Sequence, residues 1–146
     1  MHFQTNLLLL KRPHLHTFQR ALANLARSVP FELSVSLHSQ GEEIYYFPFL
    51  ENNISEGNCA KDPIARQYRV AKRCAVVLSK ELGYKISKPE GTACYGGFSD
   101  FTAGELMIPS LTVEIGRGKN PLPASEYIKI KERFVKAMVS LVLTLA

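Results

Sequence analysis

The chain lacks several features that would place it in a common class of protein. Its three cysteines are an odd number without paired spacing, which argues against a disulfide framework, and no CxxC pair is present to build a structural zinc site. No run approaches the ~18 apolar residues that a membrane-spanning helix needs. The run Leu7–Leu10 is too short for a secretory signal, and Lys11 and Arg12 follow it. We therefore expect a cytoplasmic protein with no membrane partner.

The chain also lacks a concentrated run of one charge. Its net charge is +5, but the basic residues are spread along all 146 residues. The densest basic group lies within one helical stretch, and we interpret it as the solvent-exposed face of that helix: Arg66, Arg69, Lys72 and Arg73. We therefore expect no nucleic-acid partner. With 46% apolar and 21% charged residues, the composition is that of one globular domain with a hydrophobic core.

The first half of the chain alternates helix and strand patterns, which predicts an α/β fold. Apolar residues at helical spacing predict a helix over residues 17–28, which Pro30 ends. Strict alternation of apolar and polar residues predicts a half-buried strand from Phe31 to Leu37, and aromatic and β-branched residues predict a second strand over 44–47.

The second half continues this alternation. Asp62, Pro63 and Gly83 are typical of the start and the end of a helix. A short strand is expected over 84–87, and Cys74 falls on the apolar face of the preceding helix.

The last elements are a buried strand and a long helix. The composition of residues 111–115 predicts the strand, and the glycines and prolines of 116–123 predict a long turn after it. Ser125 is expected to cap the final helix. Upstream of this strand, residues 95–97 with Asp100 have the composition of a tight turn followed by an aspartate that supports it.

His38 is a candidate functional residue because it stands at the carboxyl end of a predicted strand, where open α/β sheets form their sites. A histidine there can bind a metal or act as a base. The alternative is a surface histidine hydrogen-bonded to its own loop. Glu42 and Glu43 follow closely, and we interpret them as solvated loop charges.

Glu114 is the second candidate because it interrupts an apolar strand between Val113 and Ile115. A carboxylate on a buried strand is costly unless it is paired or used. Alternation places Glu114 on the opposite face from its two neighbours, so it can instead point into solvent or pair with Arg117. Two classes remain open at this point, a metal-dependent hydrolase using His38 and Glu114 and a binding module without catalysis.

Three motifs occur in one order along the chain. Residues 37–46 read LHSQGEEIYY, residues 96–101 read GGFSDF, and residues 111–116 read LTVEIG, followed by GKNPLP. Together they resemble the carboxypeptidase A clan of zinc metallocarboxypeptidases, and more narrowly its bacterial branch of γ-D-glutamyl-L-diamino-acid endopeptidases, which cleave peptidoglycan peptides. The resemblance covers residues 20–146 as the C-terminal part of such a domain and leaves 1–19 as an unmatched N-terminal segment.

The resemblance implies zinc-dependent hydrolysis of a peptide substrate and gives roles to individual residues. His38 matches the third zinc ligand. Glu114 matches the general base, which takes a proton from the zinc-bound water and passes it to the leaving amine. Ser99 falls where the clan places the residue that selects the substrate side chain. The clan's mobile tyrosine would fall near Thr92, and Tyr95 is the nearby residue that could take that role.

The chain departs from the clan upstream of His38. The clan's first two zinc ligands form an HxxE pair, which this sequence does not contain, so the chain supplies one of three expected protein ligands. Either a complementary N-terminal chain supplies the others, or the chain is a truncated remnant.

The resemblance also implies a fold. We expect a mixed, largely parallel sheet with helices packed on it, about half of the clan's sheet, with an open edge and an apolar surface. We further expect a strained or cis peptide bond just after His38 and another near Gly116.

Overall fold

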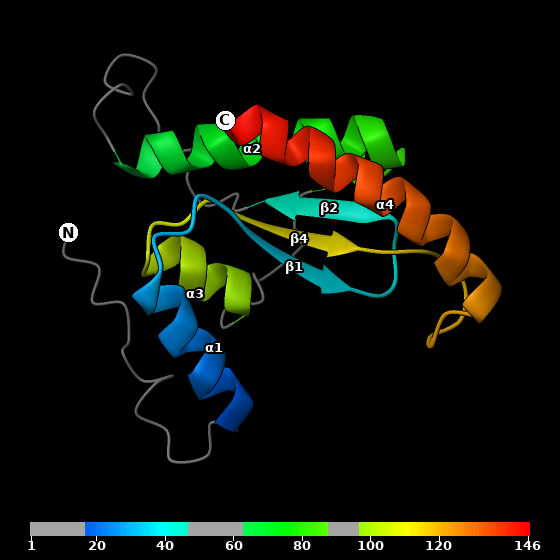
Figure 1. The fold of residues 1–146 in the computed structure, drawn as a ribbon, viewed down its shortest axis with the longest axis horizontal. Helices are drawn as coiled ribbons and strands as arrows, with labels where there is room; N and C mark the ends of the chain where they lie inside the picture. The colour runs from blue at the N-terminus through cyan, green and yellow to red at the C-terminus, as the bar shows by residue number, and fades with distance from the viewer. Residues whose placement is uncertain (1–16, 47–62, 88–96) are drawn as a thin grey trace.

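The computed structural model describes residues 17–46, 63–87 and 97–146. The elements follow one another as α1 (Thr17–Ser28), β1 (Ser34–His38), β2 (Glu43–Tyr46), α2 (Pro63–Leu82), β3 (Lys85–Ile86), α3 (Phe98–Gly104), β4 (Ser110–Glu114) and α4 (Ala124–Leu145). Figure 1 shows α2 and α4 above one face of the sheet and α1 and α3 below the other. The predicted α/β class is confirmed. In the described ranges, no helix combines the length and the apolar character that crossing a membrane requires.

The four strands form one mixed sheet in the order β1-β4-β2-β3. β1 pairs with β4 and β2 pairs with β3 in parallel, whereas β2 and β4 are antiparallel. The sheet is therefore largely parallel, as predicted. β4 comes last along the chain but lies between β1 and β2, so the ends of β1 and β4 meet at one edge of the sheet.

The two faces of the sheet differ in chemistry because side chains alternate along each strand. Leu111 and Val113 are fully buried toward α2 and α4, where they join the main core. The core also contains the following side chains: Ile44, Cys74, Leu78, Leu82, Ala137 and Leu141. Fully burying one such aliphatic side chain contributes about 1.5–3 kcal/mol. The opposite face carries Ser110 and Thr112 and is covered by α3.

The helix α2 begins and ends where its local signals predict. Pro63 is its first residue, and Gly83 follows its last one with a φ of 73°. Glycine adopts this left-handed conformation without steric cost, and its N–H donates to the Ser79 carbonyl (2.8 Å) to close the helix. Asp62 and Phe47 lie outside the described residues, as do residues 95 and 96 of the predicted turn.

Two predicted boundaries were wrong. β1 begins at Ser34, because the Phe31 N–H donates to Val29 in a turn and the first sheet bond runs from the Ser34 N–H to Pro109. α4 begins at Ala124 after Pro123, so Ser125 lies inside the first turn and does not cap it.

The segment that we predicted as a tight turn opens a helix, α3, which starts at Phe98. Gly97 stands at its N-cap position, and the Gly97 N–H donates to the Asp100 carboxylate (2.9 Å). Asp100 thus supports the local backbone, as predicted, but it does so as the third residue of a helix.

Candidate functional site

The two candidate residues lie side by side at the carboxyl end of the parallel pair. His38 and Glu114 are the last residues of β1 and β4, and they are register partners. The Ile115 N–H donates to the His38 carbonyl (2.8 Å), which holds the two strand ends together. Register partners in a sheet project from the same face, so the imidazole and the carboxylate share the face opposite the apolar core. The structure thus brings the two candidate residues together at this edge; their chemical roles stay predictions.

The His38 ring is oriented by a residue of its own strand. Its Nε2 lies 3.1 Å from the Ser36 Oγ, two residues earlier on the same face. If Nε2 carries the proton and donates to Ser36, the Nδ1 atom presents a lone pair. Metal-binding histidines commonly use one ring nitrogen in this way while the other donates to a neighbouring oxygen. His38 is exposed, so its Nδ1 atom is accessible from solvent.

The loop after His38 lies directly against Glu114. A Cβ atom placed on Gly41 would lie 3.0 Å from the Glu114 Cβ, so only a glycine fits this approach without a shift. The Gly41 N–H donates to the Gly116 carbonyl (2.8 Å), which ties this loop to the turn after β4. The Ser39–Gln40 peptide bond in this loop is cis, at the position we predicted. The other cis bond of the described residues joins Asn120 to Pro121 and not Gly116 to Arg117, where the second one was expected.

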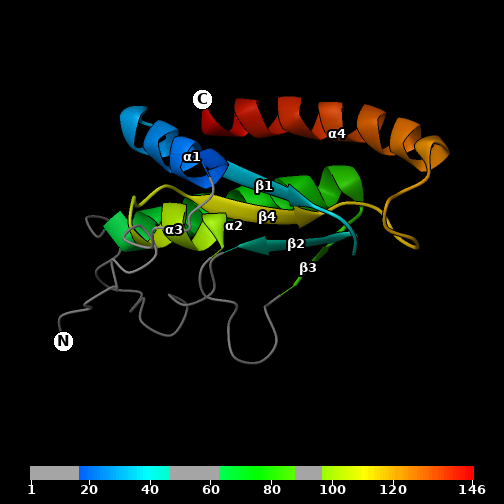
Figure 2. The ribbon, with the colours of Figure 1, turned by 90° about the horizontal axis from the view of Figure 1, so that it is seen from below.

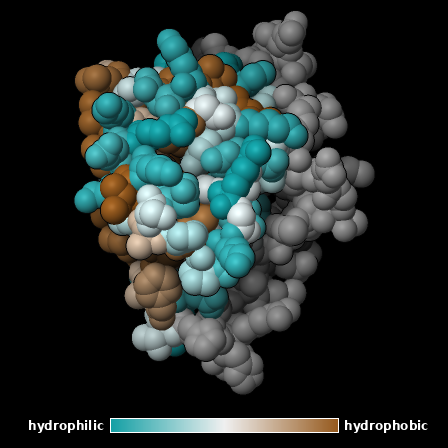
Figure 3. All heavy atoms as spheres, turned by 90° about the vertical axis from the view of Figure 1, so that its right-hand side faces the viewer, coloured by the Kyte–Doolittle hydropathy of each residue, from teal (hydrophilic) through white to brown (hydrophobic). Residues whose placement is uncertain are grey.

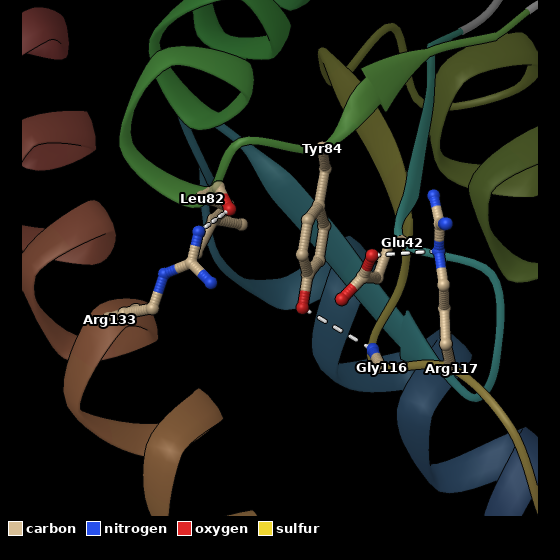
Figure 4. Close-up of polar contacts among 6 residues, drawn as sticks. All are labelled: Glu42, Leu82, Tyr84, Gly116, Arg117 and Arg133. Atoms are coloured by element: carbon tan, nitrogen blue, oxygen red, sulfur yellow. Dashed lines mark hydrogen bonds and ion pairs between the residues drawn. The ribbon is translucent and has the colours of Figure 1, made fainter. Parts of the chain in front are cut away.

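Further polar contacts join the two loops. The Arg117 Nε lies 2.8 Å from the Glu42 Oε2 (Figure 4). The Ser39 hydroxyl donates to Asn120 Oδ1 (3.3 Å), and the Asn120 amide donates back to the Ser39 carbonyl (3.4 Å). The proposed pairing of Arg117 with Glu114 is therefore wrong, because its guanidinium bonds to Glu42. These bonds fix the two loops that border the strand ends.

A buried tyrosine supports the turn after Glu114. The Gly116 N–H donates to the Tyr84 hydroxyl (3.3 Å), and Tyr84 itself is buried (Figure 4). Figure 4 also shows Arg133 of α4 donating to the Leu82 carbonyl at the end of α2. The first contact connects the carboxyl edge of the sheet to buried Tyr84, and the second connects α4 to the end of α2 just before it, so the position of Glu114 depends on the packing of the core.

Ser99 lies on the same face of β4 as Glu114. Its hydroxyl is 2.8 Å from the Thr112 hydroxyl and donates to the Leu111 carbonyl (3.4 Å). Thr112 precedes Glu114 by two residues on that face, so α3 places Ser99 beside the strand that carries the predicted base. The other two predicted substrate-binding residues, Thr92 and Tyr95, lie outside the described residues.

Glu43 is a neighbour of the site that the sequence analysis missed. It is the register partner of Glu114 on the other side of β4, so His38, Glu114 and Glu43 form a row across three strands. The Tyr45 hydroxyl donates to the Glu43 carboxylate and holds the pKa of Glu43 below its ordinary value, with Lys85 acting in the same direction and burial opposing. We had interpreted Glu43 as a solvated loop charge, because strand pairing between distant segments cannot be read from local composition.

The side chains at this edge can be compared with the ligands that the implied zinc ion would need. Within 17–46, 63–87 and 97–146, no three His, Cys, Asp or Glu side chains come together in a group that could hold a metal ion. A catalytic zinc needs three protein ligands and an open position. His38 provides one imidazole, so the described residues do not make a complete zinc site.

The chain is similar in sequence to one enzyme of known activity. It shares 32% identity over 108 residues with the γ-D-glutamyl-L-diamino acid endopeptidase 1 of Lysinibacillus sphaericus, which corresponds to 73% of this chain. The same segment is 23% of that enzyme, so the chain spans about a quarter of its relative. No family profile matches the chain. The predicted resemblance to a peptidase is thereby confirmed, and the assignment to the carboxypeptidase A clan stays a prediction.

Proposed function

We propose that the chain contributes the general base and one zinc ligand to a peptidase site of the carboxypeptidase A clan. The observation that carries this proposal is the register pairing of His38 with Glu114 at the carboxyl edge of the parallel strands. A histidine and a carboxylate at this edge are the groups that a metal-dependent hydrolase needs next to the scissile bond. The similarity to a γ-D-glutamyl-L-diamino acid endopeptidase supports the same reaction.

The role of this chain in the reaction follows from its own side chains. The Glu114 carboxylate accepts a proton from the attacking water and delivers it to the nitrogen of the leaving amine, which splits the peptide bond. His38 holds one coordination position through its imidazole, with Ser36 fixing the ring. Ser99, on the same face, contacts the substrate side chain. The proposed substrate is a peptide with a γ-D-glutamyl bond to a diamino acid, as in fragments of peptidoglycan.

A chimera tests this function directly. The matched segment of the Lysinibacillus enzyme is replaced by the corresponding segment of this chain, and hydrolysis of a γ-D-glutamyl-diaminopimelate peptide is measured. Glu114→Gln in the chimera should lower kcat/KM by about 10²–10⁴-fold, because a carboxamide cannot accept the proton. Glu32→Gln is the matched control, since that side chain is 74% exposed and pairs with Arg66 away from the site. Equal rates for the two variants would refute the role of Glu114.

A second candidate function is a binding module without catalysis. The observation in its favour is the lack of a group of three metal donors within the described residues. Binding of the same peptide by the isolated chain, measured calorimetrically, would support it if affinity persisted in Glu114→Gln and in His38→Ala. The first proposal predicts that the isolated chain shows no zinc-dependent binding of this peptide.

A further inference from the structure

A single row of polar side chains crosses all four strands of the sheet. His38 of β1 is the register partner of Glu114 of β4, and Glu114 has Glu43 of β2 as its partner on the other side. Glu43 is in turn the register partner of Lys85 of β3. Figure 2 shows the four strands one below another in this order, from β1 to β3. Register partners project from the same face, so the row lies on the face opposite the apolar core.

The outer part of this row carries two opposite charges. The hydrogen bond from Tyr45 holds the pKa of Glu43 below its ordinary 4.5, so the carboxylate is negatively charged at neutral pH. Lys85 is exposed, and the ion pairs among the described residues do not include one between Lys85 and Glu43. A carboxylate can accept about four hydrogen bonds, and Tyr45 supplies one of them. Glu43 therefore keeps the capacity to bind a further cation.

A buried hydroxyl without a partner lies beside Glu43. The Ser87 Oγ is buried and forms no hydrogen bond within the described residues. The Ser87 N–H donates to the Ile44 carbonyl (2.9 Å), which places Ser87 two residues beyond Lys85 on the same face. The Ser87 side chain also helps to lower the pKa of Glu43, so the two side chains lie near each other. A buried hydroxyl left unsatisfied costs free energy, and a polar ligand group at Glu43 would supply its missing partner.

These groups adjoin Ser99, the residue expected to select the substrate side chain. Tyr45 is the register partner of Thr112, whose hydroxyl lies 2.8 Å from the Ser99 Oγ. Ser99 is neutral and donates to the Leu111 carbonyl (3.4 Å). A substrate side chain that carries an ammonium group therefore finds no opposing charge at Ser99 itself. The carboxylate of Glu43, on the strand next to β4, provides that charge.

The surface near this edge of the sheet is largely hydrophilic. Figure 3 views the molecule from the right-hand side of Figure 1, toward which the arrows of β1 and β4 point. Hydrophilic side chains cover much of the coloured surface in this view, and the hydrophobic side chains gather along its left margin. An apolar ligand would bury little apolar surface against such a region, so the surface suits a charged ligand.

The dimensions of a diamino acid suit the row. Neighbouring strands lie ~4.8 Å apart, so Glu43 lies about one strand spacing from Glu114 and Lys85 about two. In diaminopimelate, the two α carbons are joined through three methylene groups and lie roughly 5 Å apart when the chain is extended. With the nitrogen of the leaving amine at Glu114, the distal ammonium lies beside Glu43, and the carboxylate on the same carbon faces Lys85.

We propose that Glu43 is a specificity-determining residue of this site, whose carboxylate binds the side-chain ammonium of the diamino acid while Lys85 binds the carboxylate next to that ammonium. This inference rests on the proposed function and assigns the residues by which the same site distinguishes its substrate. Hydrogen bonds between charged partners are stronger than neutral ones. A site whose polar groups are left unpaired by an analogue discriminates against that analogue.

Three dipeptides that differ only at the end of one side chain test the proposal: γ-D-glutamyl-diaminopimelate, γ-D-glutamyl-lysine and γ-D-glutamyl-norleucine. Their side chains end in an ammonium with a carboxylate, in an ammonium alone and in a methyl group. Binding of each dipeptide to the zinc-free full chain is measured by titration and nuclear magnetic resonance. The diaminopimelate peptide should bind most tightly, and the norleucine peptide should bind at least about tenfold more weakly, because it lacks both charged groups.

Substitutions in the row assign each preference to one residue. Glu43→Gln should reduce the preference for diaminopimelate over norleucine to less than about threefold, and Glu43→Asp, which keeps the charge, should restore part of it. Lys85→Gln should reduce the preference for diaminopimelate over lysine and leave that for lysine over norleucine unchanged. Glu32→Gln is the matched control, since Glu32 is 74% exposed and pairs with Arg66. Thermal melting shows that each variant is folded. A purely structural role of Glu43 would instead weaken the binding of all three peptides equally.

The outcomes separate this inference from the proposed function. Equal binding of the three peptides by the wild type, no binding of any of them, or preferences that Glu43→Gln leaves unchanged would each overturn the inference. A preference that depends on Glu43, without hydrolysis by the Lysinibacillus chimera, supports the inference and counts against the proposed function. Hydrolysis by the chimera that Glu114→Gln abolishes, at equal rates for the diaminopimelate and norleucine peptides, supports the function and overturns the inference.

Discussion

The turn after Glu114 depends on the absence of a side chain at Gly116. This residue is buried with a φ of 72°, a conformation in which L-residues are strained. A Cβ atom there would lie 2.8 Å and 2.9 Å from the two Cδ atoms of Leu122 and 3.1 Å from the Ile130 Cδ1. Gly116→Ala therefore combines two costs, about 1–2 kcal/mol for the left-handed backbone and about 1–3 kcal/mol for overpacking.

Gly118→Ala isolates the first of these costs. Gly118 has a φ of 101°, but nothing lies within 4 Å of a Cβ placed on it. We expect a loss of about 1–2 kcal/mol for Gly118→Ala and about 2–5 kcal/mol for Gly116→Ala in urea unfolding, with unchanged m-values. Two variants that differ by less than about 0.5 kcal/mol would show that Leu122 and Ile130 do not crowd the turn, and the described packing around it would be wrong.

Three further predictions concern other groups of the core and the site. Tyr84→Phe leaves the buried Gly116 N–H without its acceptor and should cost about 1–3 kcal/mol in the same unfolding assay; a neutral result would mean that this bond is not formed. The hydrogen bond from Tyr45 lowers the pKa of Glu43 in the folded chain below its ordinary value of 4.5. This bond therefore stabilises the fold fully above pH 4.5, and the stabilisation is lost as the pH falls through the lowered pKa. Glu43→Gln should therefore flatten the fall in stability below pH 4.5, and a profile parallel to that of the wild type would contradict this. Burial raises the pKa of the Cys74 thiol. In a variant in which Cys59 and Cys94 are replaced by serine, Cys74 should therefore react with a thiol reagent at about pH 8 far more slowly in the native chain than in denaturant. Equal rates in the two conditions would show that Cys74 is accessible.

Local signals were sufficient for part of the fold. The proline and the glycine at the two ends of α2 act within one turn of the backbone, and both boundaries were predicted. The helix α3 was missed because its seven residues follow glycines and contain Asp100, a composition shared by turns and helix starts. Neither case depends on contacts with distant parts of the chain.

The site was harder to predict than the fold because strand pairing joins distant residues. His38 and Glu114 were identified as candidates from their places at the end of, or within, an apolar strand, and the resemblance assigned them to one site. Glu43 was not identified as a candidate, since only the antiparallel pairing of β2 with β4 brings it beside Glu114. The ion pair of Glu42 with Arg117 likewise joins two loops that are far apart in the sequence. Register between distant strands has no local signature, so these neighbours required the structure.

The zinc content of the chimera tests the central claim most directly, namely that His38 and Glu114 belong to one metal-dependent site that this chain does not complete alone. After dialysis against zinc and removal of free metal, we expect about one zinc per chimeric chain in the wild type and in Glu114→Gln, and a large loss in His38→Ala, because one of three ligands is removed. The isolated chain should retain far less than one zinc. Full zinc in the His38→Ala chimera, or tight stoichiometric zinc in the isolated chain, would contradict the account.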